Sequence, residues 1–181
     1  MNPGTYTFGP ADGTLRVRTG RQGLVSMVGH DLTLEAANWR ATATVDDDMG
    51  CSEVRAVIEP RSLDVVGATG GAKPVTDRDR RDIKKNIAGL LGNDSITFQS
   101  TSVQAKDGVG VTVTGDLSIA QRIRRVTLDL TIEPDGGTAR LQGRLPIVQS
   151  DFGLRPFVGL MGALKVKDEV EVALDIRLPA G

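Results

Sequence analysis

The stretch from Val109 to Ile132 alternates in character along its length and constrains the fold more than any other stretch. Aliphatic residues or glycine occupy every second position from Val109 to Ile119, and Thr, Asp or Ser fill positions 112, 114, 116 and 118 between them. The pattern returns from Val126 to Ile132. A period of two residues is typical of a strand with one buried face. The stretch therefore predicts an antiparallel hairpin whose aliphatic face needs a cover: a second sheet, closure of the same sheet, or a bound apolar molecule.

Similar alternation recurs in shorter runs along most of the chain. These runs lie at residues 14–19, 31–35, 39–45, 53–59, 63–66, 95–103, 139–147 and 169–178. Counting the substantial runs gives about eight strands. An open sheet of that size would leave long unpaired edges, so the pattern favours closure into a barrel or pairing into a sandwich. The sequence thus predicts an all-β fold.

One segment has helical spacing instead of alternation. Thr76 is a candidate N-cap with Asp79 three residues later, and Gly92 follows the last apolar residue. Between them, the apolar residues recur three or four positions apart, at Ile83, Ile87, Leu90 and Leu91. The remaining positions are mostly charged. The pattern predicts one amphipathic helix that lies over an end or a flank of the sheet with most of its surface exposed.

Length and composition limit the classes of function. The 181 residues suit a single domain spanning 1–181. The formal net charge of −1 argues against a protein that coats nucleic acid, and the single cysteine, Cys51, excludes an internal disulfide. The sequence has no apolar stretch of membrane-spanning length and no secretory leader pattern at its start. We therefore expect a soluble, cytoplasmic protein without integral membrane association.

The inward-facing positions of the predicted strands are unusually small. They include Ala41, Ala43, Ala56, Gly115 and Gly143. The interior of an eight-stranded barrel is just wide enough for packed side chains or one small ligand, so small residues favour a ligand cavity. A barrel packed shut, acting as an interaction or structural module, is the alternative interpretation.

The sequence lacks the residue patterns of known motifs for catalysis and for metal or nucleotide binding. The glycine-rich stretch before the helix lacks P-loop spacing, because Ala72 precedes Lys73 and Pro74 follows it. His30 is the only histidine, and its sequence neighbour Asp31 would point to the opposite face of a strand. We expect no catalytic residues, no metal and no cofactor. An isomerase or hydrolase acting on an apolar substrate is a distant third hypothesis, and His30 would be its only candidate for proton transfer.

Several motifs together resemble the YceI-like family. The runs ITFQSTSV, VTVTGDLSI and RVTLDLTI resemble its F-x-S and glycine-leucine signature in order and spacing, and SDFGL resembles its late S-x-F-G motif. The chain departs from the family pattern where AQRIRR replaces the usual glycine and threonine. The matching positions are Phe98, Ser100, Gly115, Leu117, Phe152 and Gly153.

The resemblance implies an eight-stranded antiparallel lipocalin-like β-barrel with one α-helix, which holds a long isoprenoid or similar amphipathic lipid. The expected function is non-enzymatic binding, sequestration or transport of a polyisoprenoid, isoprenoid quinone or fatty-acyl lipid, with a homodimer as a further expectation. Met161 and its neighbouring glycines would supply an adaptable lid. The predicted head-group contacts are His30, Arg122 and Arg124. The predicted contacts to the lipid tail are Trp39, Phe98, Val113, Leu117, Leu128, Leu141, Phe152, Leu154, Phe157, Leu160 and Met161.

Overall fold

The computed structural model describes residues 2–23, 26–47, 50–106 and 110–178. These residues contain fourteen strands and one α-helix, with four short 3-10 helices between them. Eleven strands form one antiparallel sheet: β1 (Gly4–Phe8), β2 (Gly13–Arg18), β4 (Asp31–Ala36), β5 (Trp39–Val45), β6 (Cys51–Ile58), β7 (Leu63–Thr69), β8 (Ile96–Lys106), β9 (Gly110–Ile119), β10 (Arg122–Asp135), β11 (Thr138–Val148) and β14 (Glu169–Leu178). The short strands β3 (Arg21–Gln22), β12 (Val158–Gly159) and β13 (Leu164–Val166) form a second sheet.

Three of the long strands are kinked in the middle, so each is divided into two. The strand formed by β4 and β5 pairs on one side with β2 and β1, and on its other side with β7 and β6. These three kinked strands and the five unbroken strands β8, β9, β10, β11 and β14 make eight. The predicted eight-stranded antiparallel barrel is therefore confirmed, and the higher strand count comes from the kinks and the small second sheet.

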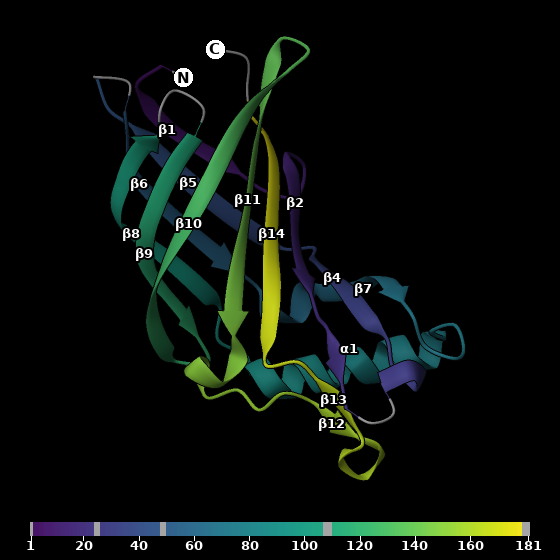
Figure 1. The fold of residues 1–181 in the computed structure, drawn as a ribbon. Coiled ribbons are helices and arrows are strands. Elements are labelled where there is room, and N and C mark those ends of the chain that lie inside the picture. The colour runs from purple at the N-terminus through teal and green to yellow at the C-terminus, as the bar shows by residue number, and fades with distance from the viewer. Residues whose placement is uncertain (1, 24–25, 48–49, 107–109, 179–181) are drawn as a thin grey trace.

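The barrel closes through the kinked strands, because β6 pairs with β8 and β14 pairs with β2. Of the two outer kinked strands, only the halves β2 and β6 take part in this closure. β1 and β7 therefore remain as the free edges of the sheet. The helix α1 (Asp77–Leu91) packs beside β7. Figure 1 shows α1 across the lower end of the barrel, which we call the helix end. We call the opposite end, where β1 begins and β14 finishes, the far end.

Backbone hydrogen bonds hold two of the kinks together. The amide of Ala37 donates to the carbonyl of Ser62 at 3.0 Å, and the amide of Glu59 donates to the carbonyl of Asn38 at 3.0 Å. Pro60 begins the short helix η2 (Pro60–Ser62) between β6 and β7, and it has no amide to continue a ladder. The kinks therefore lie side by side, and Trp39 begins β5 halfway along the barrel.

The helix has the ends that its sequence predicts. The Thr76 hydroxyl accepts from the Asp79 amide at 3.2 Å, and the Asp79 carboxylate accepts from the Thr76 amide at 2.8 Å, which completes a capping box. Gly92 ends the helix with a φ of 75°. Ile87 and Leu91 pack against the barrel core, while no residue of α1 is fully buried. The expected helix, which lies over one end with most of its surface exposed, is confirmed.

The predicted hairpin is present as β9 and β10. Leu128 pairs with Val113 and Val126 pairs with Gly115, so the two aliphatic stripes share the inner face. Ala120 and Gln121 alone form the turn, with φ values of 48° and 64°. Arg122 is therefore already in β10, so most of AQRIRR belongs to a strand rather than to the turn. Val109 lies outside the described residues.

Three parts of the chain contain strands that the alternation did not predict, and one of them is β3 (Arg21–Gln22). β1 precedes the first predicted run and continues into β2 through a turn at Gly9, whose carbonyl accepts from the Asp12 amide at 2.9 Å. The connection between β11 and β14 is mostly irregular, as expected, but it contains the helix η3 (Gln149–Phe152) and the strands β12 and β13. This connection forms much of the helix end.

Candidate functional site

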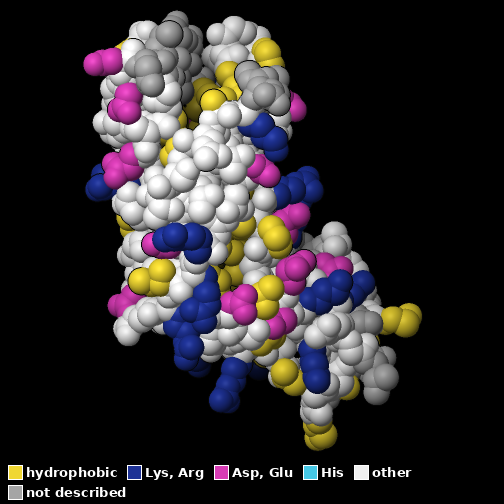
Figure 2. Space-filling model, turned by 60° about the vertical axis from the view of Figure 1, so that its left-hand side comes forward, with side chains coloured by type: hydrophobic (Ala, Val, Ile, Leu, Met, Phe, Trp, Pro, Cys, Tyr) yellow, Lys and Arg dark blue, Asp and Glu magenta, His cyan; other side chains and the backbone are white. Residues whose placement is uncertain are grey.

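The barrel encloses a cavity of about 1790 Å³ that runs from the helix end to the far end. Residues from every long strand and from α1 line it, and nearly all of those in the middle of the barrel are apolar. Figure 2 shows hydrophobic side chains inside a hollow at the far end. The predicted preference for a cavity over a filled core agrees with this geometry.

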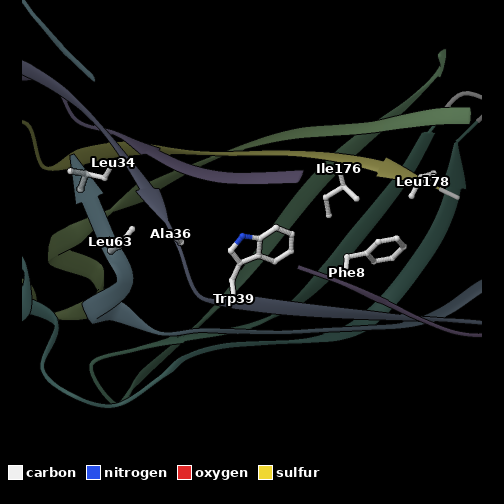
Figure 3. Close-up of a cluster of buried hydrophobic side chains, with 7 residues drawn as sticks. All are labelled: Phe8, Leu34, Ala36, Trp39, Leu63, Ile176 and Leu178. Atoms are coloured by element: carbon white, nitrogen blue, oxygen red, sulfur yellow. The ribbon is translucent and has the colours of Figure 1, made fainter. Parts of the chain in front are cut away.

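A cluster of buried side chains marks the middle of the cavity (Figure 3). The indole of Trp39 lies between Leu34 and Leu63 on one side and Phe8 and Ile176 on the other. Trp39 is only 4 % exposed, and its Nε1–H has no hydrogen-bond partner among the described residues. A buried unpaired donor costs about 1–3 kcal/mol. The middle of the barrel therefore tolerates an unsatisfied donor, and the described residues that line it there include no charged group.

The small inward residues do not all open space. A Cβ on Gly115 would lie 2.5 Å from the Phe98 ring, and a Cβ on Gly143 would lie 2.5 Å from the Leu130 side chain. The missing side chain at each glycine is thus replaced by a large neighbour from the next strand. Ala41, Ala43 and Ala56 do line the cavity. The space in the barrel comes from these alanines rather than from the glycines.

Charged lining residues are confined to the two ends of the cavity. Asp46 lies at the far end, and the helix end contains Arg21, Lys73, Asp79, Asp82, Arg155 and Lys165. The Thr76 hydroxyl and amide donate hydrogen bonds to Asp79, which lowers the pKa of its carboxyl group. Arg21 donates to the carbonyl of Gly29 at 2.5 Å. Nothing in the local sequence pattern of these residues shows that they meet at one mouth, so they were not predicted as site residues.

His30 also lines the helix end, but its ring is engaged in the protein. Nε2 lies 2.7 Å from the carbonyl oxygen of Lys73, and since a carbonyl can only accept, Nε2 carries a proton. The backbone of Gly71 packs directly against the same ring. No group of potential metal ligands occurs in the described part of the chain. The imidazole thus fastens the loop before α1 to the start of β4.

Cys51 lines the far end of the cavity. Burial raises the pKa of its thiol, a change that the hydrogen bond toward the Glu53 carbonyl only partly opposes. A neutral thiol is a weak nucleophile. At Cys51, the far end therefore presents a small and weakly reactive side chain.

Eight of the predicted tail contacts line the cavity: Trp39, Phe98, Val113, Leu117, Leu128, Leu141, Leu154 and Phe157. Phe152 does not line it; its side chain is buried in a second core cluster, behind the cluster members Ile119 and Ile147, which do line the cavity. Met161 does not either, since its side chain is fully exposed. The side chain of Leu160 lies outside the described residues.

The predicted head-group arginines do not line the cavity. Arg122 lies against Gly153, where an added Cβ would be 2.5 Å from its Nε. The next residue, Leu154, does line the cavity. Arg124 is exposed and donates to the carbonyl of Ile123. Arg122 pairs with Ile119 and Arg124 pairs with Leu117, and both partners line the cavity, so strand pairing alone does not place a residue on the lining.

No helix in the described part of the chain combines the length and the apolar character needed to cross a bilayer.

Comparison with known proteins places the fold. The chain is similar to the crystal structure of BcnA from Burkholderia cenocepacia, with a TM-score of 0.66 and 18 % identity over 92 % of this chain and 96 % of that chain. It is also similar to the YCEI protein of Campylobacter jejuni, with a TM-score of 0.52 and 15 % identity over 80 % and 82 % of the two chains. A mutant CJ YCEI protein with a monobromobimane guest has a TM-score of 0.54 and 14 % identity, over 80 % and 82 %. No curated protein matches the sequence.

The family follows from the sequence itself. A model of the family described as "YceI-like domain" matches residues 6–178, which span all the long strands and the helix. The resemblance carried by the F-x-S, glycine-leucine and S-x-F-G motifs is thus confirmed. The chain belongs to the YceI-like domain family.

Proposed function

We propose that this protein binds a long-chain amphipathic lipid of the polyisoprenoid or isoprenoid quinone type inside its barrel, and sequesters or carries it. The observation that supports the proposal is the cavity of about 1790 Å³, which is apolar in the middle and charged only at its ends. Burying a methylene group stabilises a complex by about 0.8 kcal/mol. A long tail would therefore bind without any specific polar contact.

The charge distribution suggests which way the lipid would lie. The helix end combines four basic lining residues and His30 with the acids Asp79 and Asp82, whereas Asp46 is the charged residue among the described lining of the far end. A polar or anionic head group would therefore lie near Arg21, Lys73, Arg155 and Lys165, with the tail directed past Trp39. This assignment replaces Arg122 and Arg124 with residues that line the cavity.

The alternatives fit the cavity less well. A barrel that serves only as an interaction module would have its interior filled by side chains, and this one has room for a long guest. For an enzyme, His30 is the candidate for proton transfer that the sequence offers, but its Nε2 already donates to a backbone carbonyl. We therefore propose that the protein is not an enzyme. A cytoplasmic location and a homodimer are further expectations.

Extraction tests the proposal directly. The protein, purified from its own host, should release a stoichiometric long-chain compound into organic solvent, detected by mass spectrometry. Binding in solution should change the fluorescence of Trp39, the only tryptophan, because its indole lines the cavity. Absence of both signals would contradict lipid binding and would favour the interaction module.

A matched pair of variants tests the location. Ala43→Phe adds a ring inside the cavity, and Thr44→Phe adds the same ring to the next residue of β5, which does not line it. We expect Ala43→Phe to weaken lipid binding roughly tenfold, since a ring displaces several buried methylenes. Thr44→Phe should bind like the wild type. Equal binding by both variants would place the lipid elsewhere.

A further inference from the structure

Exposed apolar side chains gather at the helix end. Eight large hydrophobic residues are exposed in the described part of the chain, and five of them belong to two neighbouring segments: Met27, Val28, Phe157, Val158 and Met161. Met161 is fully exposed and Met27 is 83 % exposed. Figure 2 shows hydrophobic side chains projecting from the lower tip of the molecule. Isolated exposed hydrophobic residues are ordinary, but a cluster of them marks an interaction surface.

The two segments are joined by the small sheet. β13 pairs with β12 on one side and with β3 on the other, and the side chain of Leu164 lies 2.5 Å from the position of a Cβ on Gly29. We call this unit, formed by the described residues of 21–29 and by 157–166, the flap. Met161 has a φ of 55°, a left-handed conformation that is unusual for a residue with a side chain. The flap thus holds a long apolar side chain outward at the tip of a turn.

The flap is also part of the cavity mouth. Val28 and Phe157 line the cavity, yet they are 46 % and 48 % exposed. Each of these side chains therefore faces the cavity and the solvent at once. Val28 and Phe157 thus connect the exposed part of the flap with the cavity lining.

Basic residues surround the same mouth. Lys73, Arg155 and Lys165 line it, and none of them forms an ion pair with another described residue. The nearby acidic side chains have other partners: Asp79 accepts hydrogen bonds from Thr76, and Asp82 lies 4.0 Å from Arg78. Apolar tips with unpaired basic side chains beside them are suited to the headgroup region of an anionic bilayer.

We propose that the flap is a membrane-docking surface, which inserts its apolar tip into the headgroup region of a bilayer that contains anionic lipids. Docking would bring the cavity mouth to the bilayer, so that a lipid passes between the two without crossing water. A second copy of the chain fits less well, because a symmetric contact through the flap would bring its basic residues against each other. The transfer of lipid rests on the proposed function, whereas docking does not.

Vesicle sedimentation tests docking. The wild-type protein should sediment with vesicles of equal parts phosphatidylcholine and phosphatidylserine, and much less with phosphatidylcholine alone or at high salt. The variant Met27→Ser/Val158→Ser/Met161→Ser removes apolar side chains of the tip that do not line the cavity. We expect it to bind the mixed vesicles about tenfold more weakly. A matched control, Val57→Ser/Val66→Ser/Ile123→Ser, removes three exposed apolar side chains elsewhere and should sediment like the wild type.

Three results would overturn docking: no sedimentation of the wild type, no loss in the flap variant, or an equal loss in the control. A change of oligomeric state in the flap variant, measured by light scattering, would instead assign the flap to self-association. Lipid uptake from detergent, followed by Trp39 fluorescence, keeps the two proposals apart. If uptake fails in every variant while the wild type still docks, the proposed lipid binding is wrong and the docking surface stands.

Discussion

The β9–β10 hairpin and the segment 149–166 both contribute apolar side chains to one cavity, but they are built differently. In the hairpin, every second residue from Val111 to Ile119 faces inward, and the pairing with β10 keeps one register throughout. In the segment, Phe152 is 3 % exposed whereas Met161 is fully exposed, although both are large and apolar. Alternation predicts burial because a barrel wall has two faces. Apolar content without a period does not predict which side chains are buried.

The largest expected effect is a difference in stability between variants of two residues in the segment 149–166, one buried and one exposed. Phe152→Ala should lower the free energy of unfolding by about 3–5 kcal/mol, because it empties a site in the second core cluster. Met161→Ala should change it by less than about 0.5 kcal/mol, because that side chain has no packing to lose. Chemical denaturation measures both. Similar values for the two variants would show that the segment is uniformly packed or uniformly loose.

A smaller effect is expected at the turn of the β9–β10 hairpin. Ala120 and Gln121 both have positive φ, a geometry that favours asparagine and glycine in two-residue hairpin turns. Ala120→Asn should therefore raise the free energy of unfolding by roughly 0.5 kcal/mol. Thermal denaturation of the variant measures this change. A decrease in stability would mean that packing of the Ala120 methyl group outweighs the backbone strain.

The smallest effect concerns the outer face of the wall, where β11 meets β14. Arg140 donates to Asp175 through two nitrogens, at 2.6 and 2.5 Å, and this contact lowers the pKa of the Asp175 carboxyl group. A lowered pKa in the folded state contributes stability above the unfolded-state pKa, and that contribution is lost as the pH falls through the folded-state value. Asp175→Asn should thus destabilise the protein slightly at neutral pH and hardly at all in strong acid. The side chains are partly exposed, so salt should weaken the difference. A difference that persists in strong acid would contradict the ion pair as its cause.

Much of the fold could be predicted because its signals are local. The strands 39–45 and 169–178 have the predicted bounds. Thr76 and Asp79 cap the start of the helix and Gly92 ends it, as expected. β1 was missed, and so were the flap strands β3, β12 and β13, which contain only two or three residues each, too few to establish a period. The kinks were missed because Pro60 appeared to end a strand, whereas β7 continues it after a single turn.

The site was only partly predictable for a related reason. Eight tail contacts were placed on the inner face by alternation or by their apolar character, and the structure places these eight on the cavity wall. Gly115 was expected to leave room, yet the Phe98 ring of the neighbouring strand occupies that room. Arg155 and Lys73 were not identified, although they meet at one mouth from segments more than eighty residues apart in the printed sequence.

The sequence by itself determined most of the long strands, the helix ends and the inner face of the barrel wall, because these depend on neighbours within a few residues. Only the tertiary structure decided where the barrel is hollow, which charged groups share a mouth and which apolar side chains stay exposed. Those properties depend on strand register and on contacts between distant segments. Arg122 and Arg155 illustrate the difference: both are basic residues near an end of a strand or turn, and only the closed barrel places Arg155, and not Arg122, on the cavity lining.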